Sequence, residues 1–127
     1  MSDRAHAERL LRALYGARID GQLEQLCGLF AATARFRIAG TSDGKPIAMA
    51  AQGIDAIRPW LTMLVKTFKL TRYELLSMII ESTSAAVHWR ADIHSKITGT
   101  KVATELIDLI ELRDGRIASY TEFFVPC

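Results

Sequence analysis

Two carboxylic acids lie close together near the C-terminus, in the stretch TELIDLIELRDGRIASYTEFF. Asp108 interrupts an apolar run that has the composition of a β-strand, and Glu122 lies in the run that follows the turn residues RDG. Burying an unpaired charge in such a run costs several kcal/mol. Either this strand lies at a surface with Asp108 in water, or the fold uses a buried carboxyl group.

Two histidines, His88 and His94, lie in the segment VHWRADIH, in which apolar and polar residues alternate strictly. The apolar set, which includes Trp89, should face the core, and the polar set should then point outward or to a subunit contact. A three-residue turn at ITG would reverse the two faces and aim His88 at Asp108 as an acid–base pair. Two histidines six residues apart on a strand are a poor metal site, so we expect no metal.

No sequence motif indicates a cofactor. The chain contains no GxSxG nucleophile motif, phosphate-binding loop or dinucleotide fingerprint. Trp60, Met63, Phe68 and Met78 are therefore expected to form core or pocket wall, and we predict a cofactor-free protein.

The N-terminal half has the periodicity of helices. Apolar residues recur at helical spacing from residue 3 to 18, and a shorter helix is expected from Asp20, as N-cap, to Leu29. The strand ATARFRIAG and a small edge strand, IAMAAQG, precede a third helix, GIDAIRPWLTMLVKTFKL. From Thr71 onward, four segments rich in β-branched and aromatic residues alternate with turn signals. This order predicts an α+β fold with helices on one face of an antiparallel sheet.

Length and composition limit the class of protein. A chain of 127 residues, half of them hydrophobic, suits one domain spanning 1–127. With a net charge of +2, the tightest basic cluster is Lys66, Lys69 and Arg72, which is typical of a solvated helix end, so we expect no nucleic-acid partner. No apolar segment reaches signal-peptide or membrane-spanning length, so we expect no membrane partner. Two cysteines form no disulfide framework, which suits a reducing cytoplasm.

The layout resembles the nuclear transport factor 2-like superfamily, and within it the SnoaL-like polyketide cyclases and ketosteroid isomerases. The resemblance is carried by two N-terminal helices, a strand after LF, a helix after GIDAI, and the closing pair IDLIELRDGRIASYTEFF. It implies a conical barrel in which three helices pack on a strongly curved, mostly antiparallel sheet, with a pocket between them. The outer sheet face commonly forms a homodimer in this superfamily. Members include isomerases, cyclases, dehydratases, epoxide hydrolases and non-catalytic binders, so the fold alone does not give the function.

The turn between the last two strands decides what Asp108 meets. A two-residue turn at DG places Asp108 opposite Thr121, whereas a three-residue RDG turn places it opposite Tyr120 with Glu122 diagonal. We favour the three-residue turn, because it puts Asp108 where the resembling isomerases keep a protonated aspartic acid that donates a hydrogen bond to an oxyanion. Apolar neighbours at Leu106 and Ile110 and the charge of Glu122 would favour the same neutral form here.

Other site residues are carried over from the resemblance. Tyr15 lies within a residue of the position of the isomerases' oxyanion tyrosine. Their general base is an aspartate just after the first strand, and this chain has Ile38 or Ala39 there, so proton shuttling of the steroid-isomerase kind is doubtful. Glu122 or His88 would have to act as the base instead.

These observations predict a protein that binds a small, largely apolar molecule, with possible cofactor-free isomerisation, cyclisation or dehydration; the alternative is a non-catalytic ligand-binding or dimerisation domain. The candidate catalytic residues are Asp108, Glu122, Tyr15 and His88. The candidate ligand-binding residues are Tyr120, Phe124, Trp60, Trp89, Leu106, Ile110 and Met63. A patch of Ile107, Leu109, Phe123 and Ile117 is expected to form the dimer contact.

Overall fold

The computed structural model describes residues 2–42 and 44–126. These residues form three helices and six strands, and two of the strands lie between the second and third helices. In chain order the elements are α1 (Ser2–Asp20), α2 (Leu23–Gly28), β1 (Phe30–Ser42), β2 (Lys45–Gln52), α3 (Ile54–Lys66), β3 (Phe68–Glu81), β4 (Ser84–Ser95), β5 (Lys101–Arg113) and β6 (Arg116–Pro126). The predicted α+β class is confirmed. The second helix begins later than expected, because Gly21 has a positive φ of 72° and ends α1, so Asp20 closes one helix and does not cap the next.

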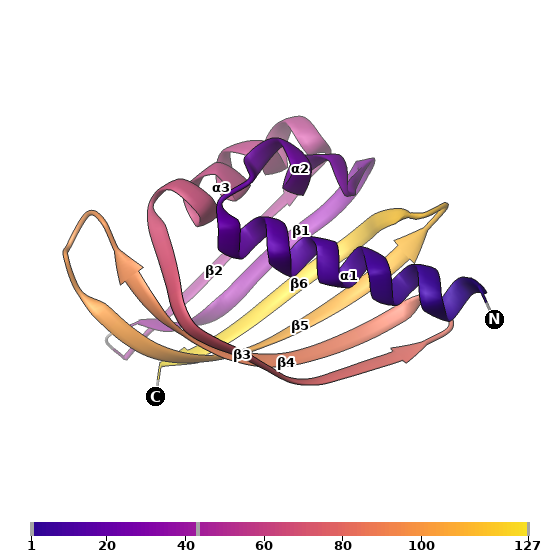
Figure 1. Ribbon diagram of the computed structural model, residues 1–127. Helices are drawn as coiled ribbons and strands as arrows, with labels where there is room; N and C mark the ends of the chain where they lie inside the picture. Colours follow the sequence, from indigo (N-terminus) through magenta and orange to yellow (C-terminus); the bar gives the residue numbers. More distant parts are fainter. Residues whose placement is uncertain (1, 43, 127) are drawn as a thin grey trace.

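The six strands form one curved sheet in the order β2-β1-β6-β5-β4-β3. Every neighbouring pair is antiparallel except β1 with β6, which is parallel. All three helices lie on the same side of the sheet, and α1 runs across its concave face (Figure 1). This arrangement gives the sheet an inner face toward the helices and an outer face that no described element covers.

The register of β5 and β6 differs from both sequence expectations. The turn is the two-residue one, because Arg113 pairs with Arg116 and both Asp114 and Gly115 have positive φ. A bulge between Glu111 and Leu112 in the pairing then shifts β6 by one more residue, so Asp108 lies directly opposite Glu122. The preferred three-residue turn was therefore wrong.

The predicted division of the two faces nevertheless holds for most positions. The bulge and the shorter turn together change the register by an even number of residues relative to the expectation, which preserves the inward and outward sets. Asp108, Tyr120 and Glu122 are buried on the inner face, while Leu109 and Phe123 are exposed on the outer one.

The core fills the space between the helices and the inner face. It combines the apolar side of α1 and α3 with alternate residues of the strands, among them Phe36, Trp89 and Ile110. One expected surface residue, Ile117, is fully buried, so its assignment to the outer patch was wrong. It pairs with Leu112 just before the bulge, where the alternation along β6 is interrupted.

Candidate functional site

The inner face carries a cluster of polar side chains that have almost no exposure. Asp108, on β5, has none, Glu122 on β6 is 3% exposed, and Arg18 on α1 is 6% exposed. Tyr15 and Tyr120 are also buried. We call these five residues, with Trp89, the buried polar cluster.

The α1 helix supplies two of its members. Tyr15 and Arg18 are three residues apart, so they project from the same side of the helix toward the sheet. The Tyr15 ring meets the Trp89 ring edge-on, with centroids 5.4 Å apart, and the Arg18 guanidinium carbon lies 4.9 Å from the centre of the Trp89 ring. Trp89 therefore holds both α1 side chains in place from the inner face of β4.

One oxygen of Asp108 accepts hydrogen bonds from three donors. The Tyr15 hydroxyl lies 2.5 Å from Oδ2, the Tyr120 hydroxyl 2.8 Å, and the Trp89 indole nitrogen 2.9 Å. The other oxygen, Oδ1, is buried and has no hydrogen-bond partner among the described residues. A buried polar atom of this kind is uncommon in folded proteins, where such atoms are normally paired.

Glu122 has a different environment from Asp108. Arg18 donates to both of its oxygens, from Nη1 to Oε1 and from Nη2 to Oε2 at 3.2 Å. This two-pronged ion pair is buried on both sides. The Tyr120 hydroxyl lies between the two acids, 3.1 Å from Glu122 Oε1 and 3.2 Å from Arg18 Nη1. Since a hydroxyl has one proton to donate, Tyr120 can serve one acid at a time.

The electrostatics favour a protonated Asp108. Burial raises its pKa well above the ordinary range, and the charge of Glu122 raises it further, while Arg18 and the hydrogen bonds from Tyr15 and Tyr120 act in the opposite direction. Burial also raises the pKa of both tyrosines, so each remains a hydroxyl donor. For Arg18, burial would lower the pKa, but the charge of Glu122 prevails and raises it above the ordinary value, so the guanidinium stays charged.

The structure gathers most of the predicted site residues. Asp108, Glu122, Tyr15, Tyr120 and Trp89 meet in the buried polar cluster, and Leu106 and Ile110 flank Asp108 on the same face. Three further predicted ligand-binding residues are half-buried against the core: Phe124, Trp60 and Met63.

The alternative that aimed His88 at Asp108 is wrong. Val87 pairs with Asp108, so the alternation of β4 points His88 to the outer face, where its ring meets Glu105. The favoured alternation of VHWRADIH, with Trp89 inside, is confirmed.

Sequence reasoning missed Arg18. Its position continues the apolar stripe of α1 that includes Leu11 and Leu14, at the spacing of one helix face. An arginine on that stripe signals a buried cation, which requires a buried carboxylate as partner.

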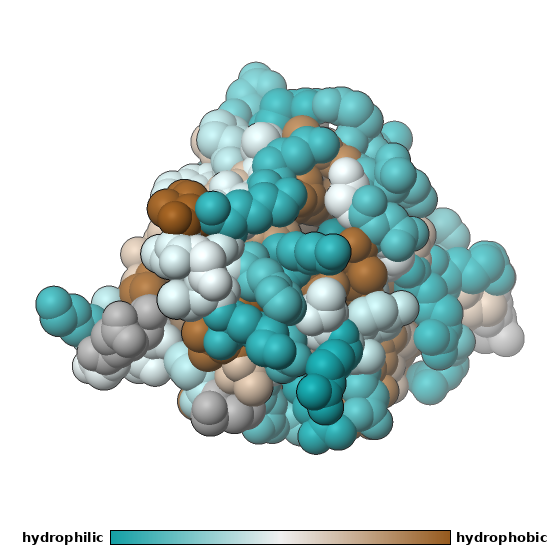
Figure 2. Space-filling view, turned by 60° about the vertical axis from the view of Figure 1, so that its left-hand side comes forward, coloured by the Kyte–Doolittle hydropathy of each residue, from teal (hydrophilic) through white to brown (hydrophobic). Residues whose placement is uncertain are grey.

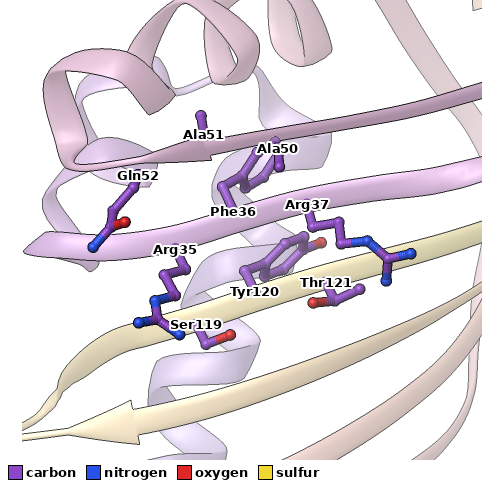
Figure 3. A pocket seen from close by; sticks show the side chains of 9 residues that line it. All are labelled: Arg35, Phe36, Arg37, Ala50, Ala51, Gln52, Ser119, Tyr120 and Thr121. Atoms are coloured by element: carbon purple, nitrogen blue, oxygen red, sulfur yellow. The ribbon is translucent and has the colours of Figure 1, made fainter.

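Two hollows lie on the outer face of the sheet. One, of about 410 Å³, is surrounded by the outward side chains of Arg35, Arg37, Gln52, Ser119 and Thr121 (Figure 3). The other, of about 300 Å³, shares Ser119 and Thr121 with the first and is bordered by Ile79, Leu109, Glu81 and Glu111. Neither hollow reaches the carboxyl group of Asp108.

Comparison with known proteins agrees with this architecture. Residues 11–120 match the SnoaL-like domain family. The chain belongs to this family. None of the curated proteins matches the sequence. Among residues 2–42 and 44–126, no helix is long and apolar enough to cross a bilayer.

Solved structures share the fold of this SnoaL-like domain. A Bacillus subtilis protein described as a candidate isomerase has 21% identity and a TM-score of 0.81, with 98% of this chain and 89% of that one covered. A candidate isomerase from Rhodopseudomonas palustris has 23% identity and a TM-score of 0.76 over 94% and 88% of the chains. An epoxide hydrolase from M. tuberculosis has 12% identity and a TM-score of 0.72 over 94% and 83%. These identities establish a shared fold, and the chemistry of the site has to be argued from its own residues.

Proposed function

We propose that this SnoaL-like domain binds a small, largely apolar molecule with a carbonyl or hydroxyl oxygen, and that Asp108 donates a hydrogen bond to that oxygen. The observation that carries the proposal is the pair of unequal oxygens of Asp108. Oδ2 accepts from Tyr15, Trp89 and Tyr120, whereas buried Oδ1 has no partner among the described residues. A proton on this carboxyl group belongs on Oδ1, since three donors already point at Oδ2.

Charge balance supports the neutral form. Arg18 and Glu122 neutralise each other through two hydrogen bonds. An ionised Asp108 would leave this dry cluster with one net negative charge, and a protonated Asp108 leaves it with none. The site then holds a buried acid that can stabilise negative charge on a ligand oxygen, as isomerisation, cyclisation or dehydration requires. No cofactor is needed for that step.

A catalytic role also requires a general base, and the cluster offers no acid that is free to act as one. Glu122 is the acid nearest to Asp108, but both of its oxygens accept from Arg18. Taking a proton from a ligand would require Glu122 to give up at least one of these hydrogen bonds. This observation favours the alternative proposal, a ligand-binding domain without catalysis. The two proposals differ in one requirement, because catalysis requires Arg18 to release Glu122 and ligand binding does not.

The apolar body of the ligand requires space beside the cluster. Trp60 and Met63 on α3 and Phe124 on β6 are the half-buried side chains proposed to form its wall. Because the cluster itself has almost no exposed surface, we expect these side chains to move apart when the ligand enters.

A matched pair of ligands tests the proposal. We expect 2-naphthol to quench the tryptophan fluorescence of the protein and to bind about two- to tenfold more tightly than naphthalene, since one hydrogen bond between neutral groups is worth about 0.5–1.5 kcal/mol. Replacing Asp108→Leu should remove this preference, while Asp108→Asn, which retains a donor, should keep part of it. Equal affinity of the wild-type protein for the two ligands would reject Asp108 as the donor.

We also propose that the protein forms a homodimer through the outer sheet face. Ile107, Leu109 and Phe123 are each at least 36% exposed there. Apolar side chains exposed together on one face of a folded domain commonly mark a contact with a partner. The dimer is independent of the ligand proposal, because Asp108 points to the opposite face.

A further inference from the structure

One end of the sheet gathers cationic side chains that are distant in the sequence. The backbone N–H of Lys96 donates to the carbonyl of Thr67 at 2.9 Å, which brings the β4–β5 loop beside Lys66 at the end of α3. Across the strands, Lys69 pairs with His94, and His94 pairs with Lys101. We call Lys66, Lys69, Arg72, Lys96 and Lys101 the basic end.

The positive charge of the basic end is concentrated and is only partly compensated. Among the described residues, its one ion pair joins the exposed Arg72 to Asp92, with Nε and Oδ2 3.9 Å apart. Among the residues that the structure describes, none of the four lysines has an ion pair. With Asp92 included, this end carries a formal charge of +4, and the rest of the chain carries −2, because the whole chain is +2. Lys69 on β3 and Lys101 on β5 lie on either side of His94 on β4, so like charges lie two strands apart at this end, and an external anion would reduce their repulsion.

An apolar side chain projects from the middle of the same end. Ile97, next to Lys96, is 81% exposed. Its loop is ordered by Ser95, whose hydroxyl accepts from the N–H groups of Ile97 and Thr98 at 3.3 and 3.2 Å, and whose carbonyl accepts from Gly99 at 2.9 Å. These hydrogen bonds fix the conformation of the loop that holds the Ile97 side chain in solvent. Figure 2 brings this side of the molecule forward and shows hydrophilic side chains over most of it, with separate apolar patches between them.

We propose that the basic end docks on an anionic lipid surface, with the lysines at the headgroups and Ile97 in the interfacial layer. Basic residues near such a surface are attracted individually, and an apolar side chain between them adds contact with the acyl boundary. Nucleic acid fits less well, since an isoleucine at the tip contributes nothing to contact with phosphates. The sequence expectation of no membrane partner rested on the lack of a spanning segment, and a peripheral contact needs none. This proposal goes beyond the proposed function, because the contact does not involve Asp108.

Sedimentation with vesicles tests the proposal. The wild-type protein should bind phosphatidylcholine vesicles that contain phosphatidylserine, release from them as salt rises, and ignore vesicles of pure phosphatidylcholine. Lys96→Glu/Lys101→Glu should weaken binding at least about 25-fold, at roughly fivefold for each cation removed. Ile97→Ser should weaken it severalfold and leave the salt dependence unchanged.

The matched control is Arg9→Glu/Arg113→Glu, which makes the same change of charge at two exposed positions outside the basic end. It should bind vesicles to within about twofold of wild type, and circular dichroism should show all variants folded. Equal loss in the control and in the lysine variant would overturn the proposal, as would equal binding to neutral vesicles. Saturable binding of inorganic pyrophosphate without vesicle binding, or displacement from vesicles by duplex DNA, would assign this end to a soluble phosphate or to nucleic acid and overturn it too.

Discussion

Asp108 and Glu122 are direct partners across β5 and β6, yet only Glu122 has a counter-charge. Arg18 reaches Glu122 from α1, while Asp108 receives neutral donors from Tyr15, Trp89 and Tyr120. Two acids at one position of a sheet thus have opposite environments. The cluster is neutral as a whole if the proton stays on Asp108.

The first prediction concerns stability against pH. The pKa of Asp108 is raised in the folded protein by burial and by Glu122, so the folded state retains a proton that the unfolded chain loses at about pH 4. The stabilisation from this proton is complete below that pH, and it is lost as pH rises toward the folded pKa. The free energy of unfolding should therefore fall by about 1.4 kcal/mol per pH unit in that window. Urea unfolding between pH 5 and 8 measures this slope.

Two variants complete that measurement. Asp108→Asn cannot ionise, so it should remove the slope and lose little stability at neutral pH, or gain some. Asp108→Ala should cost about 1–3 kcal/mol, because Tyr15 and Trp89 lose their acceptor, whereas Tyr120 can still donate to Glu122. An Asn variant that is several kcal/mol less stable than wild type at every pH would show that Asp108 is an ionised anchor.

The second prediction concerns Arg18. Replacing Arg18→Met leaves Glu122 as an unpaired buried charge, and the free energy of unfolding should drop by about 3–5 kcal/mol. The double variant Arg18→Met/Glu122→Gln removes both charges and should be more stable than Arg18→Met alone. A double-mutant cycle in chemical denaturation measures this coupling. Additive losses would mean that the ion pair contributes nothing specific.

Much of the fold could be predicted from local patterns. The sequence shows apolar residues at helical spacing in the first 70 residues and alternating apolar and polar residues after Thr71. These are the periods of helix and strand, so the element order and the inward-facing residues of β5 could be predicted. The layout of the family supplied the curvature and the position of the helices, which no period encodes.

The details that failed depend on tertiary structure. A bulge at Ala118 cannot be read from RDGRIAS, and after the two-residue turn it decided that Asp108 faces Glu122 and not Thr121. Arg18 was overlooked because arginine is normally a surface residue, although its place on the stripe of Leu11 and Leu14 was visible. Only part of the basic end was visible in the sequence, because Lys96 and Lys101 join Lys66 and Lys69 through a loop hydrogen bond and through strand pairing.

The third prediction concerns steroid isomerisation. Ile38, where the resembling isomerases have their base, is buried and pairs with Glu122 across β1 and β6. The carboxylate nearest to the expected position of the base is therefore the one that Arg18 holds. Purified protein should show negligible conversion of a 5-ene-3-ketosteroid, followed by the absorbance of the conjugated product. Turnover on the order of 10 per second, as in an ordinary enzyme, would show that another residue supplies the base.

The last prediction concerns the dimer. Light scattering at micromolar concentration should give about 28 kDa, twice the 14.1 kDa of the chain, and a value near 14 kDa would reject the outer-face dimer. The two outer hollows suggest how the copies meet. Arg35 and Arg37 border the first hollow, and Glu81 and Glu111 border the second. A two-fold axis that runs along the strands, between β5 and β6, would place the first hollow of one copy against the second hollow of the other copy.

Charge reversal tests this symmetry. Arg35→Glu and Glu111→Arg should each shift the protein toward monomer, because each places like charges together twice in a symmetric dimer. Mixing the two variants should restore a dimer, since the carboxylate introduced in one copy then meets the guanidinium introduced in the other, and the unchanged Glu111 and Arg35 form the second opposite-charge contact. Native mass spectrometry distinguishes this mixed dimer from either homodimer. If the two variants dimerise as well alone as together, Arg35 does not face Glu111, and the axis lies elsewhere on the sheet.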